Sequence, residues 1–205
     1  LTKQKTHNQY LRALVFQLYE KNGVIKRNEI NNIVKLIPAE ERKKLWGMGI
    51  KIGRYHIFLP KMLKPKAVEF RISLWKIFHN LSDKNQIPKF GLNFIINSNY
   101  EKNFLLLCGF EKFRDYFVRI DILEKLFIKI LDCSKDRKFK INSEMMNLLG
   151  CTKENFHKLM NYMDYKKSKE EDTYIFKGDR KKVKKFIKFD KKENPFKKLL
   201  SLNIK

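Results

Sequence analysis

The sequence has few of the residues that build metal centres or covalent cross-links. Its 205 residues include three cysteines and four histidines. Cys108, Cys133 and Cys151 are far apart, and neither a C-x-x-C pair nor an H-E-x-x-H string occurs. We therefore predict no disulfide framework, no metal site, and three buried cysteines that behave as small apolar residues in a reducing, cytoplasmic compartment.

Long apolar runs are missing, and acidic residues are few. No segment has the roughly 20 consecutive apolar residues of a membrane-spanning helix, so we predict no membrane partner. Acidic residues number 22 against 46 lysines and arginines, and the formal net charge is +24. Such an excess favours a polyanionic partner, either RNA or DNA. Because richness in Lys, Asn, Ile and Phe is also typical of AT-rich genomes, charge alone does not define that partner.

What the sequence does contain is a regular succession of short helical and strand patterns. Residues 49–66 read GIKIGRYHIFLPKMLKPK, in which apolar and polar residues alternate around Gly53-Arg54. This pattern predicts a β-hairpin over residues 49–59 with a short turn. Before it, Asn22-Gly23 is typical of a helix end, and helical patterns cover residues 10–20, 28–37 and 38–46. Three short helices followed by a hairpin form the order of a winged helix.

After a bridging segment, the C-terminal part of the chain repeats this order. Pro65 is predicted to begin a long helix that reaches residue 81, and residues 82–97 have the composition of a linker. Helical patterns follow over residues 100–108, 121–131, 143–149 and 152–163, and strand patterns over residues 116–120, 165–169 and 173–177. Asn142 or Ser143 and then Thr152 are typical N-caps, and Gly150 is a typical helix end.

The predicted fold class is mainly α with short β-hairpins. Two winged-helix-like units would be joined by a long helix and a linker. The predicted divisions are a first unit over residues 1–64, a bridge over 65–97, a second unit over 98–178, and a basic tail over 179–205. The sequence carries no signal for an oligomeric state.

A winged helix would contact nucleic acid through its hairpin and its third helix. Arg54 would then grip a phosphate and Tyr55 would stack on an unpaired base, while Leu59 and Pro60 would be packed and would fix the chain's entry into the next helix. The competing interpretation is a solvated Arg54 and a core Tyr55. The predicted nucleic-acid-binding residues, taken from the hairpin and its exit, the third helix of the second unit, its hairpin and the tail, are Arg54, Tyr55, Lys61, Lys64, Lys153, His157, Lys158, Lys166, Lys167, Arg180, Lys181 and Lys182.

No catalytic residue is predicted. Arg119, Asp121 and Glu124 are close in sequence, but Asp121 is typical of a helix N-cap and Arg119 of its ion-pair partner. That structural role explains both residues without acid–base chemistry. No Ser-His-Asp or Cys-His constellation is readable in the sequence.

Five strings in order resemble one protein family. They are RALVFQLYEKNGVIKR, GIKIGRYHIFLPKMLKPKAVEFRISLW, VRIDILEKL, MMNLLGCTKENFHKLMNYMDY and, at the end, NPFKKLLSL. Together they are similar to the region downstream of the motor in alphaproteobacterial superfamily 2 helicases, relatives of the mitochondrial degradosome RNA helicase. The resemblance implies an accessory C-terminal region of an ATP-dependent helicase acting on RNA.

The resemblance does not extend to an ATPase. No G-x-x-x-x-G-K-[ST] string and no DEAD- or DEAH-like string occurs, so this chain alone is not expected to be an enzyme. We predict no cofactor in this chain, since ATP and Mg²⁺ would belong to the absent motor. The chain begins without Met, and we expect motor domains in the same, longer parent chain.

Two alternatives belong to different functional classes. A protein-interaction scaffold would bind neither RNA nor DNA, and its charge would reflect genome composition. A free-standing winged-helix regulator would bind duplex DNA with a sequence preference. The helicase region would prefer single-stranded or tailed nucleic acid with little sequence preference.

Overall fold

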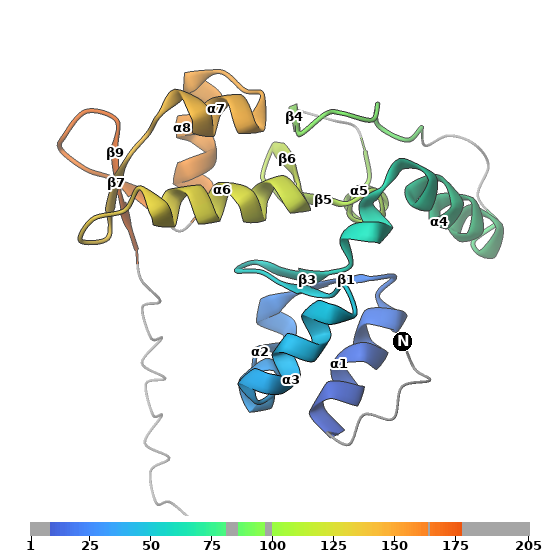
Figure 1. Ribbon diagram of the computed structural model, residues 1–205. Coiled ribbons are helices and arrows are strands. Elements are labelled where there is room, and N and C mark those ends of the chain that lie inside the picture. The colour runs from blue at the N-terminus through green and yellow to red at the C-terminus, as the bar shows by residue number, and fades with distance from the viewer. Residues whose placement is uncertain (1–8, 81–85, 97–99, 164, 178–205) are drawn as a thin grey trace, which may run out of the picture.

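The computed structural model describes residues 9–80, 86–96, 100–163 and 165–177. These residues form helices and three small antiparallel sheets, which confirms the predicted mainly helical fold with short hairpins. Figure 1 shows two bodies, one built from the first three helices and one from the last three, with further elements beside them. The tail residues Arg180, Lys181 and Lys182 lie outside the described residues.

The N-terminal unit contains three helices and a three-stranded sheet. Its elements are α1 (Gln9–Glu20), β1 (Val24–Lys26), α2 (Arg27–Leu36), α3 (Ala39–Gly47), β2 (Lys51–Ile52) and β3 (His56–Phe58). The strand order is β1-β3-β2, so the predicted hairpin gains a third strand that the sequence did not indicate. Asn22 and Gly23 have φ of 54° and 85°, which confirms the predicted left-handed end of α1.

The C-terminal unit has the same order of helices and strands. It comprises α6 (Ile120–Asp132), β7 (Lys138–Lys140), α7 (Ser143–Leu149), α8 (Lys153–Tyr162), β8 (Tyr165–Lys167) and β9 (Thr173–Phe176), with strand order β7-β9-β8. The predicted caps are confirmed: Asn142 accepts from the N–H of Met145, Thr152 accepts from Asn155, and Gly150 is left-handed. One core cluster unites α6, α7, α8 and the sheet.

A middle segment connects the two units. It contains a 3₁₀ turn, η1 (Pro60–Leu63), then α4 (Pro65–Phe78), β4 (Phe94–Ile96), α5 (Lys102–Leu107), β5 (Phe110–Phe113) and β6 (Tyr116–Arg119). The sheet order is β4-β6-β5, and Phe94 pairs with Val118. Part of the stretch predicted as a linker is thus a strand, and α4 ends three residues before the predicted end.

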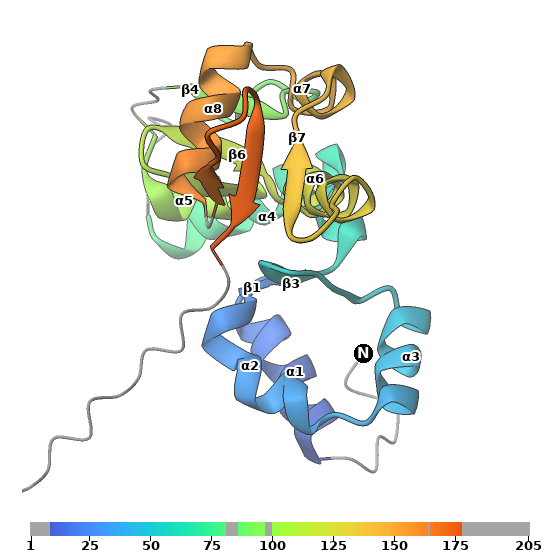
Figure 2. The same ribbon diagram turned by 90° about the vertical axis from the view of Figure 1, so that its left-hand side faces the viewer.

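The N-terminal unit contacts the rest of the molecule through its sheet. Both views show β1 and β3 on the side of this unit that faces α6 (Figure 2). Val24 and Phe58 pack with Ile120, the first residue of α6, in one buried cluster. Arg71 of α4 is buried and donates hydrogen bonds to the carbonyls of Asn22 and Leu107. These contacts hold the N-terminal sheet against the segment that follows it.

The three cysteines do not share one environment. Cys108 is buried, as predicted, and burial raises the pKa of its thiol to about 12. Cys151 is half-buried, and burial raises its pKa to about 11. The prediction is wrong for Cys133, which is exposed because it follows the last residue of α6, beyond the core.

Candidate nucleic-acid interface

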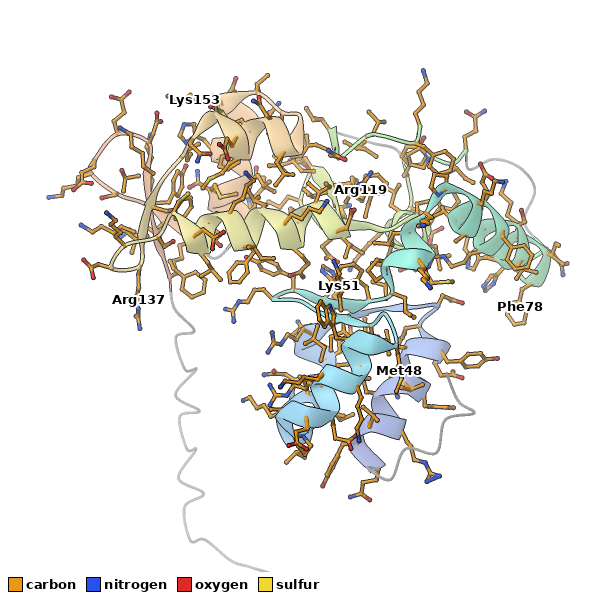
Figure 3. All side chains as sticks on the ribbon, in the orientation of Figure 1. Met48, Lys51, Phe78, Arg119, Arg137 and Lys153 are labelled. Atoms are coloured by element: carbon orange, nitrogen blue, oxygen red, sulfur yellow. The ribbon has the colours of Figure 1, made fainter. Side chains whose placement is uncertain are left out.

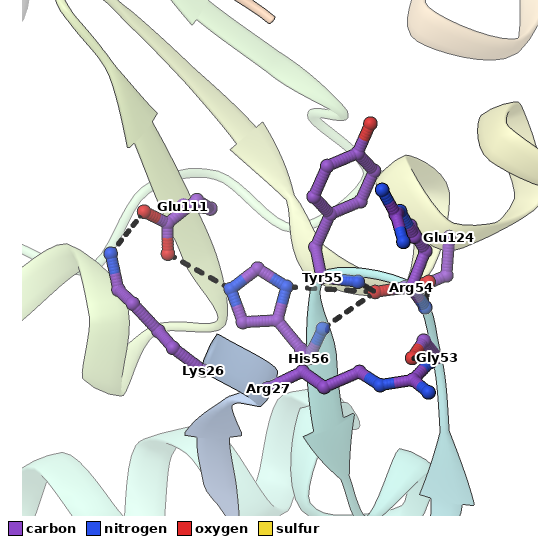
Figure 4. Close-up of polar contacts among 8 residues, drawn as sticks. All are labelled: Lys26, Arg27, Gly53, Arg54, Tyr55, His56, Glu111 and Glu124. Carbon is purple, nitrogen blue, oxygen red and sulfur yellow. Dashed lines mark hydrogen bonds and ion pairs between the residues drawn. The ribbon is translucent and has the colours of Figure 1, made fainter. Parts of the chain in front are cut away.

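The turn of the β2–β3 hairpin is bound by a carboxylate from the other body. Three consecutive N–H groups, of Arg54, Tyr55 and His56, donate to Glu124 of α6 with donor–acceptor distances of 2.6, 2.8 and 2.8 Å (Figure 4). Glu124 is buried. Converging backbone N–H groups form a small anion site, and here the anion is supplied by the protein itself. The hairpin therefore serves as a joint between the N-terminal unit and α6.

Gly53 is required by this arrangement. A Cβ built on Gly53 would lie 2.2 Å from the carboxylate carbon of Glu124, far inside van der Waals contact. The carbonyl of Gly53 also accepts a 2.8 Å hydrogen bond from Arg27 of α2. The absence of a side chain at Gly53 thus lets the Glu124 carboxylate approach the backbone. Arg27 also holds the turn, through its hydrogen bond to the Gly53 carbonyl.

A second buried carboxylate, Glu111 of β5, lies beside the first. Glu111 accepts from the ammonium of Lys26, and its other oxygen lies 2.9 Å from His56 Nε2. His56 Nδ1 is 3.7 Å from Glu124. Burial opposes protonation of the His56 ring, but the hydrogen bond with Glu111 and the nearby negative charges of Glu111 and Glu124 together outweigh burial and raise its pKa. The His56 ring thus lies between two carboxylates at the joint, and they favour its protonated form.

The pKa of Glu111 shifts in the complementary direction. Burial would raise it, but hydrogen bonds from His56 and Lys26 outweigh burial and lower it. Strand β1 supplies the lysine, β3 the histidine and β5 the carboxylate, so the network crosses from the N-terminal unit to the middle segment. It compensates the buried charges in pairs.

A cationic hollow opens next to this network. Its volume is about 490 Å³, and its lining residues, from β1, α2, the hairpin and β5, are Lys26, Arg27, Asn28, Asn31, Lys35, Arg54, Tyr55, His56, Glu111 and Phe113. Asn31 and Lys35 are four apart on α2 and share one face of the helix, while Arg27 precedes a kink at Ile30. Four arginines and lysines and the raised-pKa histidine surround one carboxylate, which leaves the hollow positively charged.

Arg54 lines the hollow but is half-buried. Its guanidinium carbon lies 5.3 Å from the ring centroid of Phe176 and 5.9 Å from that of Phe127. Leu59, predicted to pack, is half-buried against the N-terminal core, and Pro60 is half-buried as well. The hairpin tip therefore presents a cation that is positioned by aromatic rings of the C-terminal unit.

Tyr55 has the core environment of the competing interpretation. Its ring meets Phe127 edge-on at a centroid distance of 5.8 Å and packs against the C-terminal core. Its backbone N–H is used by Glu124. The side chain lines the hollow, but its ring packs against side chains of the protein itself.

The other predicted binding residues lie away from this hollow. Lys61 and Lys64 are exposed on and after η1, and Lys166 and Lys167 are exposed on β8. None of these four lines the hollow in the part of the chain that the structure describes. They stay predicted surface contacts, spread over two separate elements.

On α8, the predicted residues are engaged by acidic neighbours. Lys153 lies 2.5 Å from Asp172, and His157 lies 3.2 Å from the same carboxylate. Lys158 pairs with Glu154 at 2.5 Å. The prediction that His157 faces outward is wrong: it is half-buried, and its Nδ1 lies 2.8 Å from the hydroxyl of Tyr174. The hydroxyl and the carboxylate draw this histidine against the β8–β9 hairpin.

The expectation for the start of α6 is corrected in one detail. The helix begins at Ile120, its N-cap residue is Arg119, and no side chain caps it. Asp121 instead accepts two hydrogen bonds from the Arg119 guanidinium, at 2.6 and 2.9 Å. The predicted ion pair is thus present, while the predicted capping role is not.

Sequence reasoning missed the residues at the centre of the joint. A signal for Glu124 exists: it lies four residues after Ile120 and one after Leu123, on the apolar stripe of α6. A charged residue on a buried stripe needs a partner. Lys26, Arg27 and Lys35 carried no such signal, since their grouping depends on how α2 meets β5.

The described residues contain no group of three or more His, Cys, Asp or Glu side chains arranged to hold a metal ion. No helix among them is long and apolar enough to cross a membrane. Comparison of the chain with protein-family models, with curated proteins and with solved structures finds no match. Function must therefore be argued from the residues of the joint and its surroundings.

Proposed function

We propose that this chain is a nucleic-acid-binding accessory region of an ATP-dependent helicase acting on RNA, and that it has no motor of its own. The observation that carries the binding proposal is the cationic hollow between α2, the hairpin and β5. Phosphate groups are suitable ligands because arginine and lysine side chains line the hollow together with two asparagine amides. The net charge of +24 supports the same partner.

The fold order supports this proposal. The N-terminal and C-terminal units each have the order helix, strand, helix, helix, strand, strand, with matching sheet order. We interpret both as winged-helix-like units. The helicase part rests on the resemblance of the five sequence strings, and ATP hydrolysis would occur in motor domains elsewhere in the parent chain. Those motor domains and the RNA are the proposed partners, in the cytoplasm.

The binding proposal is tested with the 205-residue chain and labelled single-stranded RNA, duplex RNA and duplex DNA, by fluorescence anisotropy over a salt series. We expect single-stranded RNA to bind most tightly, with affinity falling steeply as salt rises. Lys35→Glu should weaken binding and reduce the slope of log K against log salt by about 0.7, the loss of one contact to single-stranded nucleic acid.

Lys140→Glu is the matched control, because Lys140 is exposed on β7 and does not line the hollow. It carries the same charge change and should shift binding less than Lys35→Glu. Equal effects of the two variants would assign binding to overall charge instead of the hollow. Absence of RNA binding at low salt would contradict the proposal.

An exposed apolar stripe on α4 favours a second candidate, the protein-interaction scaffold. Phe70, Leu74, Ile77 and Phe78 are exposed and fall at helical spacing on one face. A scaffold would leave all three nucleic acids unbound in the same titrations. Tight, sequence-selective binding of duplex DNA would instead favour the free-standing regulator.

A further inference from the structure

A second hollow adjoins the cationic one, between the N-terminal unit and α6. Its volume is about 650 Å³. Trp46, Lys51 and Pro60 line it from one side, and Lys125, Ile128 and Leu131 of α6 line it from the other. Figure 3 shows Lys51 between the lower body and α6. Arg27 and Arg54 line both hollows, so the two adjoin at the hairpin turn. We call this second hollow the α3–α6 groove.

The groove exposes large apolar side chains. Trp46, near the end of α3, is 73% exposed, and Ile128 and Leu131 are 57% and 55% exposed. An indole this accessible presents a flat face to a ligand. The joint at Glu124 holds the two walls together, because the hairpin that borders the groove is hydrogen-bonded to α6. The groove is therefore a preformed feature of the fold.

The charge in the groove favours a polyanion over an apolar peptide. Lys51 and Lys125 are exposed, and within the described ranges neither makes an ion pair. Both carboxylates of the groove are neutralised internally, Asp121 by Arg119 and Glu124 by the hairpin N–H groups. Proteins that bind single strands combine an accessible aromatic face with uncompensated lysines in one groove, and the bases lie on the ring and the phosphates on the cations.

We propose that the α3–α6 groove holds single-stranded nucleic acid, with one base stacked on Trp46 and the flanking phosphates at Lys51 and Lys125. This inference rests on the proposed nucleic-acid binding and names its substrate class and its second contact site. An internal base pair has both faces covered by its neighbours, so the interior of a duplex cannot stack on the indole. Stacking on a ring does not depend on base identity, and the groove should bind strands without sequence preference.

The test uses the whole chain and a fluorescently labelled 12-nucleotide oligouridylate at low salt. Trp46→Ala should weaken binding about tenfold, because stacking on one aromatic ring contributes on that order. Trp46→Phe should retain most of the affinity. Phe78→Ala is the matched control: Phe78 is 82% exposed, but Figure 3 places it at the far end of α4. It should leave binding unchanged.

A second readout follows the indole directly. Oligouridylate should quench the wild-type tryptophan emission, and the quenching should disappear in Trp46→Phe, which retains only Trp75. If the wild-type chain binds and Trp46→Ala binds equally well, the groove proposal is overturned while nucleic-acid binding stands. If the wild-type chain does not bind, both proposals fail. Equal quenching by duplex RNA would also overturn the single-strand assignment.

Discussion

The N-terminal and C-terminal units share one topology but use their hairpins differently. In the first, the turn after β2 gives three N–H groups to Glu124, a buried carboxylate of the other unit. In the second, Asp172, in the turn before β9, pairs with Lys153 and His157 of its own unit. The first hairpin forms a buried contact between the two units, whereas the second forms partly exposed ion pairs within its own unit. The same order of elements therefore does not imply the same contact surface.

The difference has a functional consequence. Because the first hairpin is held by α6, its tip cannot move as an independent wing. Arg54 is instead positioned between two hollows whose walls come from different units. We expect nucleic acid to contact the two sides of this joint, with the second hairpin as a separate surface of exposed lysines.

Removal of the buried carboxylate should have the largest effect on this comparison. Glu124→Ala would leave three N–H groups of the hairpin turn without their acceptor and would remove a carboxylate beside His56. We expect the free energy of unfolding in urea to fall by about 4 kcal/mol. Lys125→Ala, at the neighbouring exposed position, should change it by no more than about 0.5 kcal/mol. Equal unfolding midpoints for the two variants would mean that the joint does not stabilise the fold.

The next effect concerns the close approach at the turn. Gly53→Ala places a Cβ against the Glu124 carboxylate, which must move away from at least part of its hydrogen bonds. We expect a loss of about 2 kcal/mol in the free energy of unfolding. Gly47→Ala is the matched control, since nothing lies within 4 Å of that Cβ and the position ends helix α3. Alanine there should be neutral or slightly stabilising, and a destabilisation as large as that of Gly53→Ala would contradict the steric argument.

A smaller effect should appear as pH dependence of stability. The pKa of His56 is raised above 6.5, so its contribution is full below pH 6.5 and is lost as pH rises through the folded-state pKa. The pKa of Glu111 is lowered below 4.5, so its contribution is full above pH 4.5 and is lost as pH falls through the folded-state pKa. Between those values the network of Lys26, His56, Glu111 and Glu124 should be at its most stabilising.

Thermal unfolding over a pH series measures this window. His56→Gln should remove the decline on the alkaline side and leave the acid side, while Glu111→Gln should do the reverse. A wild-type decline above neutral pH that persists unchanged in His56→Gln would assign it to another group.

Local signals in the sequence were sufficient for much of the fold and for little of the site. The caps Asn142 and Thr152 and the left-handed Gly150 act within a few residues, so their helices were predicted with near-correct bounds. Strands β1 and β7 are three residues long and pair only with the distant β3 and β9, so no periodicity could indicate them. A periodic pattern cannot be recognised in so short a strand when its pairing partner is distant in sequence.

The site was harder because its residues come from elements far apart in sequence. Glu124 and the hairpin N–H groups are separated by 68 to 70 positions, and Lys26 and Glu111 by 85. Arg54 was predicted from its place on the turn, and it does line both hollows. Lys35 and Trp46 became candidates only through their neighbours in space. The winged-helix interpretation predicted nucleic-acid contacts on α8, but its Lys153 and His157 are paired with Asp172.

The smallest expected effect on stability concerns the second hairpin. Asp172→Asn removes the charge that meets Lys153 and His157 but keeps a residue type that tolerates the left-handed backbone found there, with φ of 55°. The Lys153 side chain is 52% exposed, so its ammonium does not need the carboxylate to offset a cost of burial, and water can replace the carboxylate. We expect no measurable change in the urea unfolding midpoint, in contrast to Glu124→Ala. Because the substitution frees the Lys153 ammonium on α8, it should also strengthen RNA binding slightly at low salt. A large loss of stability would show that the second hairpin is as tightly held as the first, and the distinction between a buried contact and partly exposed ion pairs would not hold.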